Sequence, residues 1–358
     1  MRRSLKFWIP VLMFVSVLST NLMAEPVTLE EALPAETLAL ISCRDLRGGW
    51  DRFQKTALYR IWEEPEVQEF LKPVKERIEQ QIRAARDRAK QQGGPAAAAA
   101  GLLDVVPGHV AVALLPPLSA RRPPVPEVVL LIEAHEGMDR IRALVDRGAE
   151  IAEKQAGARA AAPFTHGEVE VHQLINPQMT LCYAFDGNRF LMTISKETMT
   201  RVLDGLREPP AENLADGPLL KGVAERLGQA PETTIMLNVD GMLASYEPML
   251  QAMAPPRVMQ TLEGFRLRDI EGVAMASIID PPGIREVVHV RAPNQRRGLA
   301  GLLDQPMGAK KLLREVPKEA LVCVASRMDV AGTYEVLMEM VRSVDPPSYE
   351  RLQKRIAA

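Results

Sequence analysis

A short pattern occurs three times in the chain and limits what it can fold into. Each copy opens with a proline, continues as an apolar run of strand length and closes near an aspartate. Proline favours the first position of a strand because it cannot donate to the ladder, and aspartate caps the free N–H groups at a helix start. The pattern therefore predicts repeated strand–helix units and says little about chemistry. The copies are Pro34–Asp45, Pro231–Asp240, and Pro317–Val324 followed by Asp329.

The order of the expected elements extends this repetition. Residues 34–174 and 231–325 both read as strand, helix, strand, strand, helix, strand. Two related split β-α-β (βαββαβ-like) units would give an α+β fold with mainly antiparallel sheets covered by helices. The alternative is one long antiparallel sheet with helices on one face.

The two arrangements predict different strand neighbours. The split units place the first and third strands of each unit side by side, whereas the single long sheet pairs strands in chain order. The split pairs are Thr37–Cys43 with Glu127–Ala134 and Thr233–Val239 with Arg285–Arg291; the long sheet pairs Thr37–Cys43 with Gly108–Leu115.

The N-terminus has the features of a signal peptide. Positive charges at Arg2, Arg3 and Lys6 precede the apolar run Phe7–Leu18, and Ala24 offers a cleavage site. Twelve apolar residues are short for a membrane span. We expect a secreted or periplasmic protein, and the alternative is anchoring in the membrane by an uncleaved N-terminal segment.

The length of 358 residues suffices for two domains. After the signal peptide (1–24) we expect an N-terminal α+β domain at 25–215 and a C-terminal α+β domain at 216–358. The last expected helix ends without a capping glycine or a polar tail, as in a truncated C-terminal domain.

Composition and motifs exclude several classes of function. A net charge of −2 gives no basic field for nucleic acid, and 4% aromatic residues are few for stacking on bases or sugars. The sequence contains no G-x-S-x-G, H-E-x-x-H, G-x-x-x-x-G-K-[ST], C-x-x-C or G-x-G-x-x-G motif in a suitable context. It therefore predicts no catalytic residue and no cofactor.

The sequence contains one group of candidate metal ligands and one group of cysteines that could form a disulfide. For both groups another interpretation is favoured. His166, Glu168, Glu170 and His172 alternate along one expected strand, which spreads them over about 20 Å, too far for one ion. A solvated polar face explains the same spacing, so no metal site is predicted. The cysteines lie in separate apolar runs and are interpreted as buried small residues, with one long-range bridge as the alternative. They are Cys43, Cys182 and Cys323.

Large aromatic residues gather near the N-terminus of the mature chain. They are Trp50, Phe53, Tyr59 and Trp62. These four residues could line a groove for a peptide or a lipid. The favoured interpretation is a buried helix stripe, with Trp50 and Phe53 packed on the sheet.

Several short stretches follow one another in a defined order: a Pro-x-x-Thr strand, a helix ending near an acidic-Pro pair, an Asp-Gly hairpin and a Ser-capped helix. They are Leu33–Thr37, Arg44–Leu46, Thr56–Tyr59, Glu64–Val67 with Phe70, Asp186–Gly187 and Ser195–Glu197. This combination resembles a family of exported bacterial proteins known only as domain of unknown function 3352. The resemblance covers most of the mature chain, implies export and supplies no catalytic residues. Members of that family are often longer than this chain.

These observations favour an exported, non-catalytic protein that binds a partner protein or an apolar ligand. One alternative is an exported hydrolase without a recognisable motif, for which convergent His, Asp and Glu side chains in a cleft would be the sign. Another is a lipid or lipoprotein carrier, in which a curved sheet shelters an apolar surface.

Overall fold

The computed structural model describes residues 27–92, 108–118, 125–134, 136–155, 159–175, 180–280, 283–293, 298–303, 316–317 and 329–357. The expected signal peptide, Cys323 and most of the expected third proline-opened strand lie outside the described residues.

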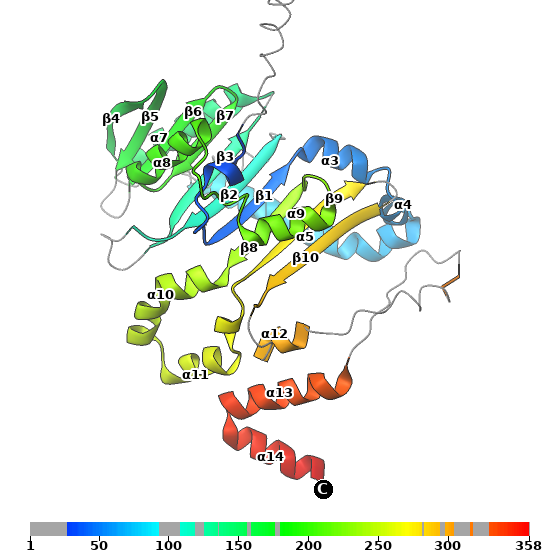
Figure 1. The fold of residues 1–358 in the computed structure, drawn as a ribbon. Helices are drawn as coiled ribbons and strands as arrows, with labels where there is room; N and C mark the ends of the chain where they lie inside the picture. The colour runs from blue at the N-terminus through cyan, green and yellow to red at the C-terminus, as the bar shows by residue number, and fades with distance from the viewer. Residues whose placement is uncertain are drawn as a thin grey trace, which may run out of the picture.

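All ten described strands belong to one antiparallel sheet with the order β10-β9-β8-β1-β2-β3-β7-β6-β5-β4 (Figure 1). The fold is therefore α+β, as expected. The strands are β1 (Ala39–Arg44), β2 (His109–Leu115), β3 (Glu127–Glu133), β4 (Arg159–His166), β5 (Val169–Ile175), β6 (Thr180–Asp186), β7 (Arg189–Thr193), β8 (Thr233–Asn238), β9 (Gly272–Asp280) and β10 (Gly283–Arg291).

The strand neighbours expected for split β-α-β units are wrong. β1 pairs with β2 and β8, not with β3, and β8 pairs with β1 and β9, not with β10. The strands follow simple meanders, β1-β2-β3 and β8-β9-β10, which is the pairing of the single long sheet. Strands that follow one another in the chain are usually neighbours in a sheet, and here they remain so although helices lie between β1 and β2 and between β8 and β9. Because β1 pairs with β8, strands from both sides of residue 215 share this sheet.

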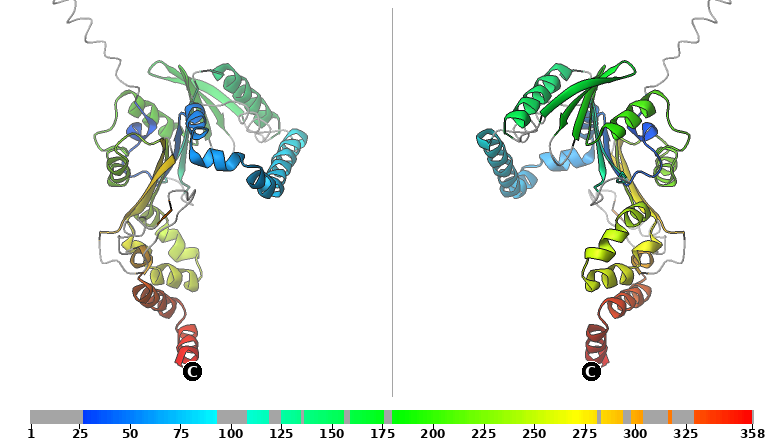
Figure 2. Two further views of the ribbon diagram at one scale, coloured as in Figure 1. Left: turned by 90° about the vertical axis from the view of Figure 1, so that its right-hand side faces the viewer. Right: turned by 90° about the vertical axis from the view of Figure 1, so that its left-hand side faces the viewer.

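Helices cover one face of the sheet along most of its width. The side chains of α2, α8 and α9 pack on the inward residues of the strands and form the larger core, with Leu40, Leu131 and Met236 among its members. Figure 2 shows these three helices together on one side. They are α2 (Leu29–Ala32), α8 (Lys196–Arg207) and α9 (Pro218–Leu227).

The opposite face carries helices as well, which the single-sheet alternative did not foresee. α7 (Met138–Gln155) lies over β3, β7 and β6 and forms a second, smaller core with Ile132, Tyr183 and Phe190. The helices α3 (Leu46–Phe53), α4 (Ala57–Glu63) and α5 (Pro65–Gln92) lie on the same side as α7 (Figure 2). We call α3, α4 and α5 the arm.

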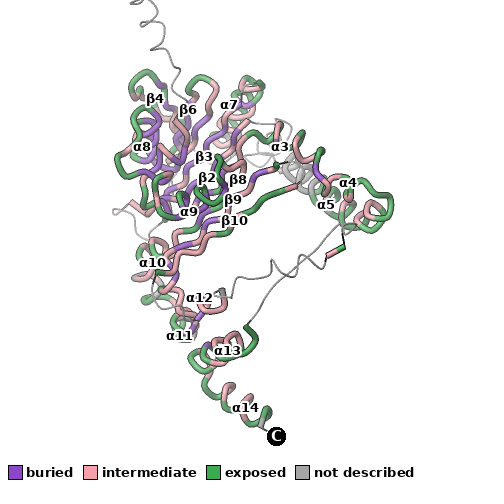
Figure 3. The backbone as a smooth tube through the Cα atoms, turned by 45° about the vertical axis from the view of Figure 1, so that its right-hand side comes forward, coloured by how far each residue is buried: buried purple, intermediate pink, exposed green. Residues whose placement is uncertain are grey.

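The C-terminal helices lie beyond β10 and away from the larger core. Buried residues gather in the strands and in α8 and α9, whereas α4, α5, α13 and α14 are mainly exposed or half-buried (Figure 3). These later helices are α10 (Val239–Met253), α11 (Pro256–Gly264), the 3-10 turn η1 (Leu267–Asp269), α12 (Gly298–Leu303), α13 (Val330–Val344) and α14 (Pro346–Ala357).

Helices begin at the positions expected after the strands, but in one of the three copies a different residue caps the helix. Asp45 and Asp329 each accept a hydrogen bond from the backbone N–H three residues later, at 3.0 Å in both cases. In the second copy the cap is Asn238, which accepts from Gly241 at 2.9 Å, and not the expected Asp240. Asparagine caps as well as aspartate does. The repeated pattern thus has a local structural cause.

The strand expected to hold four metal-ligand candidates is a hairpin. His166 ends β4, Gly167 and Glu168 form the turn, and His172 lies on β5. β4 was not expected because Pro163 interrupts it. Its ladder shifts register between Ala161 and Phe164, and proline is tolerated at such an edge strand.

Candidate functional site

The face of the sheet beside α7 carries an apolar surface that the described residues leave uncovered. We call the α7-side surface of β2, β1, β8, β9 and β10 the open face. Within these strand bounds Glu286 is its only charged side chain, as the strand alternation and register show. Its exposed apolar residues are Ile41, Val112, Ile235, Leu237, Ile284 and Val288.

Register partners align the open face into a continuous row. Directly paired residues project to the same side of a sheet, so the pairing fixes which side chains are neighbours. Across β10, β9, β8, β1 and β2 this row is Val288, Met275, Ile235, Ile41 and Val112.

The row continues under α7, where its side chains pack in a core and are no longer exposed. Val112 pairs with Leu130 of β3, and Leu130 pairs with Met192 of β7. Both Leu130 and Met192 pack in the smaller core. The row is therefore apolar from β10 to β7, but α7 covers only part of it. Uncovered apolar surface of this extent marks an interaction site in soluble proteins.

The arm is attached at one end of the open face by a polar contact. Arg52 of α3 pairs with Asp45 at 2.9 Å and with Glu232 at 3.0 Å. The helix side nearest the sheet is Gly49, where an added Cβ would lie 3.9 Å from Ile279 Cδ1. This is an ordinary van der Waals distance, so this side of α3 lies against the sheet.

The interpretation that Trp50 packs on the sheet is wrong. Its side chain is 53% exposed, because Gly49 and Arg52 occupy the side of α3 that faces the sheet. Phe53 is half-buried. The two rings contact each other and Tyr59, with centroids 5.6–6.1 Å apart. The helix stripe thus packs mainly on itself.

Trp62 stands apart from these three rings. It is 41% exposed, and the Lys75 ammonium lies 4.4 Å from its ring centroid. The structure therefore groups Trp50, Phe53 and Tyr59, while Trp62 contacts α5. Whether any of the four binds a ligand stays a prediction.

α5 presents a second uncovered apolar surface. Its residues Val67, Phe70, Leu71 and Val74 follow helical spacing, and Phe70 and Val74 are 79% and 52% exposed. We call these four residues the α5 stripe. α5 is continuous through Pro73.

A buried polar network on the other face escaped the sequence analysis. Arg44, His109, Glu133 and Arg189 are consecutive register partners across β1, β2, β3 and β7. Ser42 Oγ lies 2.9 Å from His109 Nε2, and Arg189 Nε donates to Glu133 at 3.1 Å. These residues are far apart in the chain, and only the register brings them together.

The network holds its carboxylates in the charged form. The His109 ring, 3.8 Å from the carboxylate, and the Arg189 guanidinium lower the pKa of Glu133 to about 2 despite partial burial. Burial by itself would raise the pKa of Glu30, but Arg44 at 2.8 Å and Ser42 outweigh it, so that pKa lies below its ordinary value.

Ser42, His109 and Glu133 follow the order of a hydrolase triad, but their environment differs from that of a nucleophile. Ser42 is 1% exposed in the middle of a strand, and the His109–Glu133 separation exceeds hydrogen-bond length. An adjoining cavity of about 310 Å³ is lined by His109 and Glu133, but not by Ser42. A substrate carbonyl therefore cannot reach the hydroxyl in this structure.

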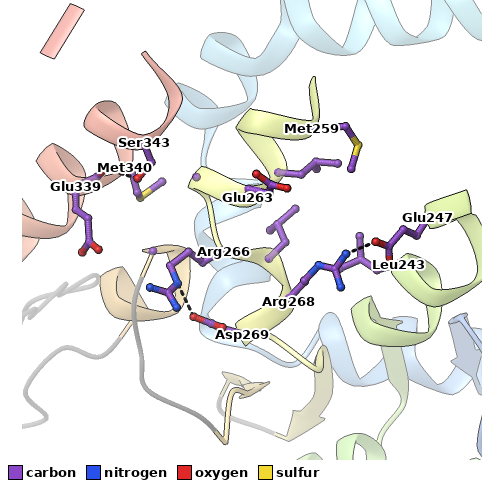
Figure 4. A pocket seen from close by; sticks show the side chains of 14 residues that line it. Leu243, Glu247, Met259, Glu263, Arg266, Arg268, Asp269, Glu339, Met340 and Ser343 are labelled. Atoms are coloured by element: carbon purple, nitrogen blue, oxygen red, sulfur yellow. Dashed lines mark hydrogen bonds and ion pairs between the residues drawn. The ribbon is translucent and has the colours of Figure 1, made fainter. Parts of the chain in front are cut away.

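A further cavity of about 340 Å³ lies among the C-terminal helices (Figure 4). Arg266 and Arg268 line it, but each already has a carboxylate partner, Asp269 at 2.9 Å for the first and Glu247 for the second. Arg266 also adopts a left-handed backbone conformation, with φ 52°. Both arginine side chains therefore form ion pairs within the protein.

The other candidate ligands have partners within the protein. His166 lies 2.6 Å from Asp204, and His172 stacks on Tyr183. In the described part of the chain, no three His, Cys, Asp or Glu side chains converge as a metal site would require. Cys182 is buried, Cys43 is half-buried, and both are free thiols.

No protein-family model matches the chain, and no curated protein or solved structure shows significant similarity to it. The described helices include none with the length and hydropathy of a membrane span.

Proposed function

We propose that this is an exported, non-catalytic binding protein that engages an apolar surface of a partner through the open face. The observation that carries the proposal is the row from Val288 to Val112, which is apolar and lacks charge, and in which every side chain but the half-buried Met275 is exposed. Burying such side chains contributes about 25 cal/mol per Å². Export rests on the signal-peptide features of residues 1–24.

A dye that fluoresces on apolar protein surfaces tests the open face directly. At a protein concentration low enough to keep the chain monomeric, it should bind the dye, and Ile41→Glu should abolish most of that binding because it places a charge within the row. The matched control is Ile175→Glu, which changes an exposed isoleucine on β5 outside the open face. Circular dichroism checks that each variant folds. Equal dye binding by the wild type and Ile41→Glu would contradict the proposal.

The rival hydrolase has one observation in its favour, the Ser42–His109 contact at 2.9 Å. The burial of Ser42 argues against it, and we assign the network a structural role that ties β1, β2, β3 and β7 to α2. A broad panel of ester and peptide substrates decides the matter. Turnover lost in Ser42→Ala, in protein that remains folded, would establish the hydrolase.

A lipid or lipoprotein carrier would use the same open face. Native mass spectrometry of protein purified from membranes distinguishes the two occupants, because a bound lipid adds a discrete mass. The dye experiment reports on the surface, and the mass measurement reports on its occupant.

We also propose that the segments beginning at β1 and β8 are related units. Both run strand, helix, strand, strand, and Asp45 and Asn238 make the same cap contact to a glycine three residues on. A sequence profile built from relatives should align residues 34–134 with residues 231–291. If the two segments do not align, the proposal fails, and the similar cap contacts arose independently.

A further inference from the structure

The part of the chain that the structure describes has two uncovered apolar surfaces, and their shapes are complementary. The open face is a sheet surface, and the α5 stripe is one side of an amphipathic helix. The sheet already accepts such a helix on this side, since α7 packs Ile141 and Val145 against Leu130 and Met192. A helix with an apolar stripe is therefore the kind of element that this side of the sheet packs.

We propose that the occupant of the open face is the α5 stripe of a second copy, exchanged reciprocally in a two-fold dimer. This inference rests on the proposed function of the open face and names its partner. A reciprocal contact of this kind is closed and symmetric, because each copy contributes one sheet surface and one helix.

The dimensions fit this exchange. Five strands span about 24 Å, and the eight residues from Val67 to Val74 of α5 span about 12 Å, so the α5 stripe covers about half the width of the open face. The open face alone covers roughly 400 Å², half of the approximately 800 Å² that each partner buries in a standard interface. Reciprocal exchange uses the face and the stripe of both copies, which brings the area to roughly the standard size.

The charges fit as well. The open face carries no charge at its centre. Its only charged side chain within the strand bounds is Glu286, which lies on the edge strand β10. The α5 stripe contains none, and its charged neighbours such as Lys72 lie on the opposite side of the helix. Two copies can meet without burying an unpaired charge, which would be costly.

Native mass spectrometry and sedimentation of the mature chain test the dimer. The wild type should be a dimer, and Phe70→Glu should be a monomer with an unchanged circular dichroism spectrum. Ile235→Glu on the open face should give the same loss. Lys72→Glu is the matched control and should remain a dimer. A monomeric wild type, or a dimer unaffected by Phe70→Glu, would overturn the proposal.

A disulfide experiment identifies the contact. Cys43 lies on the open face, so in the presence of an added thiol oxidant such as oxidised glutathione, Phe70→Cys should form a disulfide with Cys43 of a second copy and give a covalent dimer. Lys72→Cys should not, and adding Cys43→Ser should remove the cross-link. A disulfide within a monomer would show that α5 closes on its own sheet and would overturn the exchange.

The outcomes separate this inference from the proposed function. If the wild type is monomeric but Ile41→Glu still abolishes dye binding, the open face is a binding surface with another occupant, and only the exchange fails. If Ile41→Glu changes neither dye binding nor assembly, both proposals fail.

Discussion

Ile41 of β1 and Ile235 of β8 are register partners at the seam between the two strand meanders, and both side chains are exposed. Their chain neighbours Leu40 and Met236 point to the other face and are 0% and 2% exposed. Apolar residues on both sides of a strand are usual where both faces are covered. Here only one face of the seam is covered by the described helices.

This difference between the two faces predicts different effects of truncation. Leu40→Ala should lower the free energy of unfolding by about 2–5 kcal/mol because it leaves a cavity in the larger core. Ile41→Ala should cost roughly 1 kcal/mol or less in the monomer, since half of the side chain already contacts water. Urea unfolding of both variants at low protein concentration checks this, and an equal loss would show that Ile41 is covered in solution.

The exposure of Trp50 predicts the fluorescence of the mature chain. In a chain produced from Glu25 onward, which lacks Trp8, Trp62→Phe leaves Trp50 as the only tryptophan, and its emission should be red-shifted and strongly quenched by acrylamide. Trp50→Ala should cost well below the 3–5 kcal/mol typical of a buried ring. A blue-shifted, quencher-resistant emission would instead restore the interpretation that this ring is buried.

The α+β class, most strand positions and the helix caps could be predicted from local patterns. Proline, alternation and capping residues act over a few positions, so Asp45 and Ser195 could be assigned as caps from the sequence. Strand neighbours depend on contacts between distant segments. The choice between β3 and β8 as a partner of β1 was therefore open to error.

The candidate site was only partly predictable for the same reason. The aromatic group was visible because its members are close in the chain. The burial of Trp50 was predicted wrongly because a helical stripe does not show which side faces the sheet, and Gly49 and Arg52 take that side. The open face and the Ser42–His109 contact arise from register, which no local pattern encodes.

The contact between α2 and α8 predicts a sensitive glycine. A Cβ added to Gly205 would lie 2.2 Å from the Ala32 carbonyl oxygen, which is backbone and cannot rotate away. Gly205→Ala should therefore separate the two helices and destabilise the chain by about 1–3 kcal/mol despite its better helix propensity. Gly222→Ala is a useful comparison, since its added Cβ meets only the His289 ring. Thermal unfolding should show a clearly larger loss at position 205.

The charged state of Glu133 predicts how stability depends on pH. Its pKa is about 2 in the folded protein, below its ordinary value of 4.5, because the His109 ring and Arg189 favour the carboxylate. The unfolded chain therefore binds the proton first as the pH falls. The stabilisation from Glu133 is present above about pH 4.5 and is lost between that pH and about pH 2.

Glu133→Gln removes this stabilisation and makes it measurable. At neutral pH the variant should be less stable than the wild type by on the order of 3 kcal/mol, and the gap should narrow as the pH falls from 4.5 towards 2. Taking the difference between the two proteins cancels the titration of Glu30, whose pKa is lowered in the same direction. Glu136→Gln is the control, because that carboxylate is largely exposed and makes only a surface ion pair. A gap that stays constant across this range would mean that Glu133 contributes by packing, with its charge making no difference to stability.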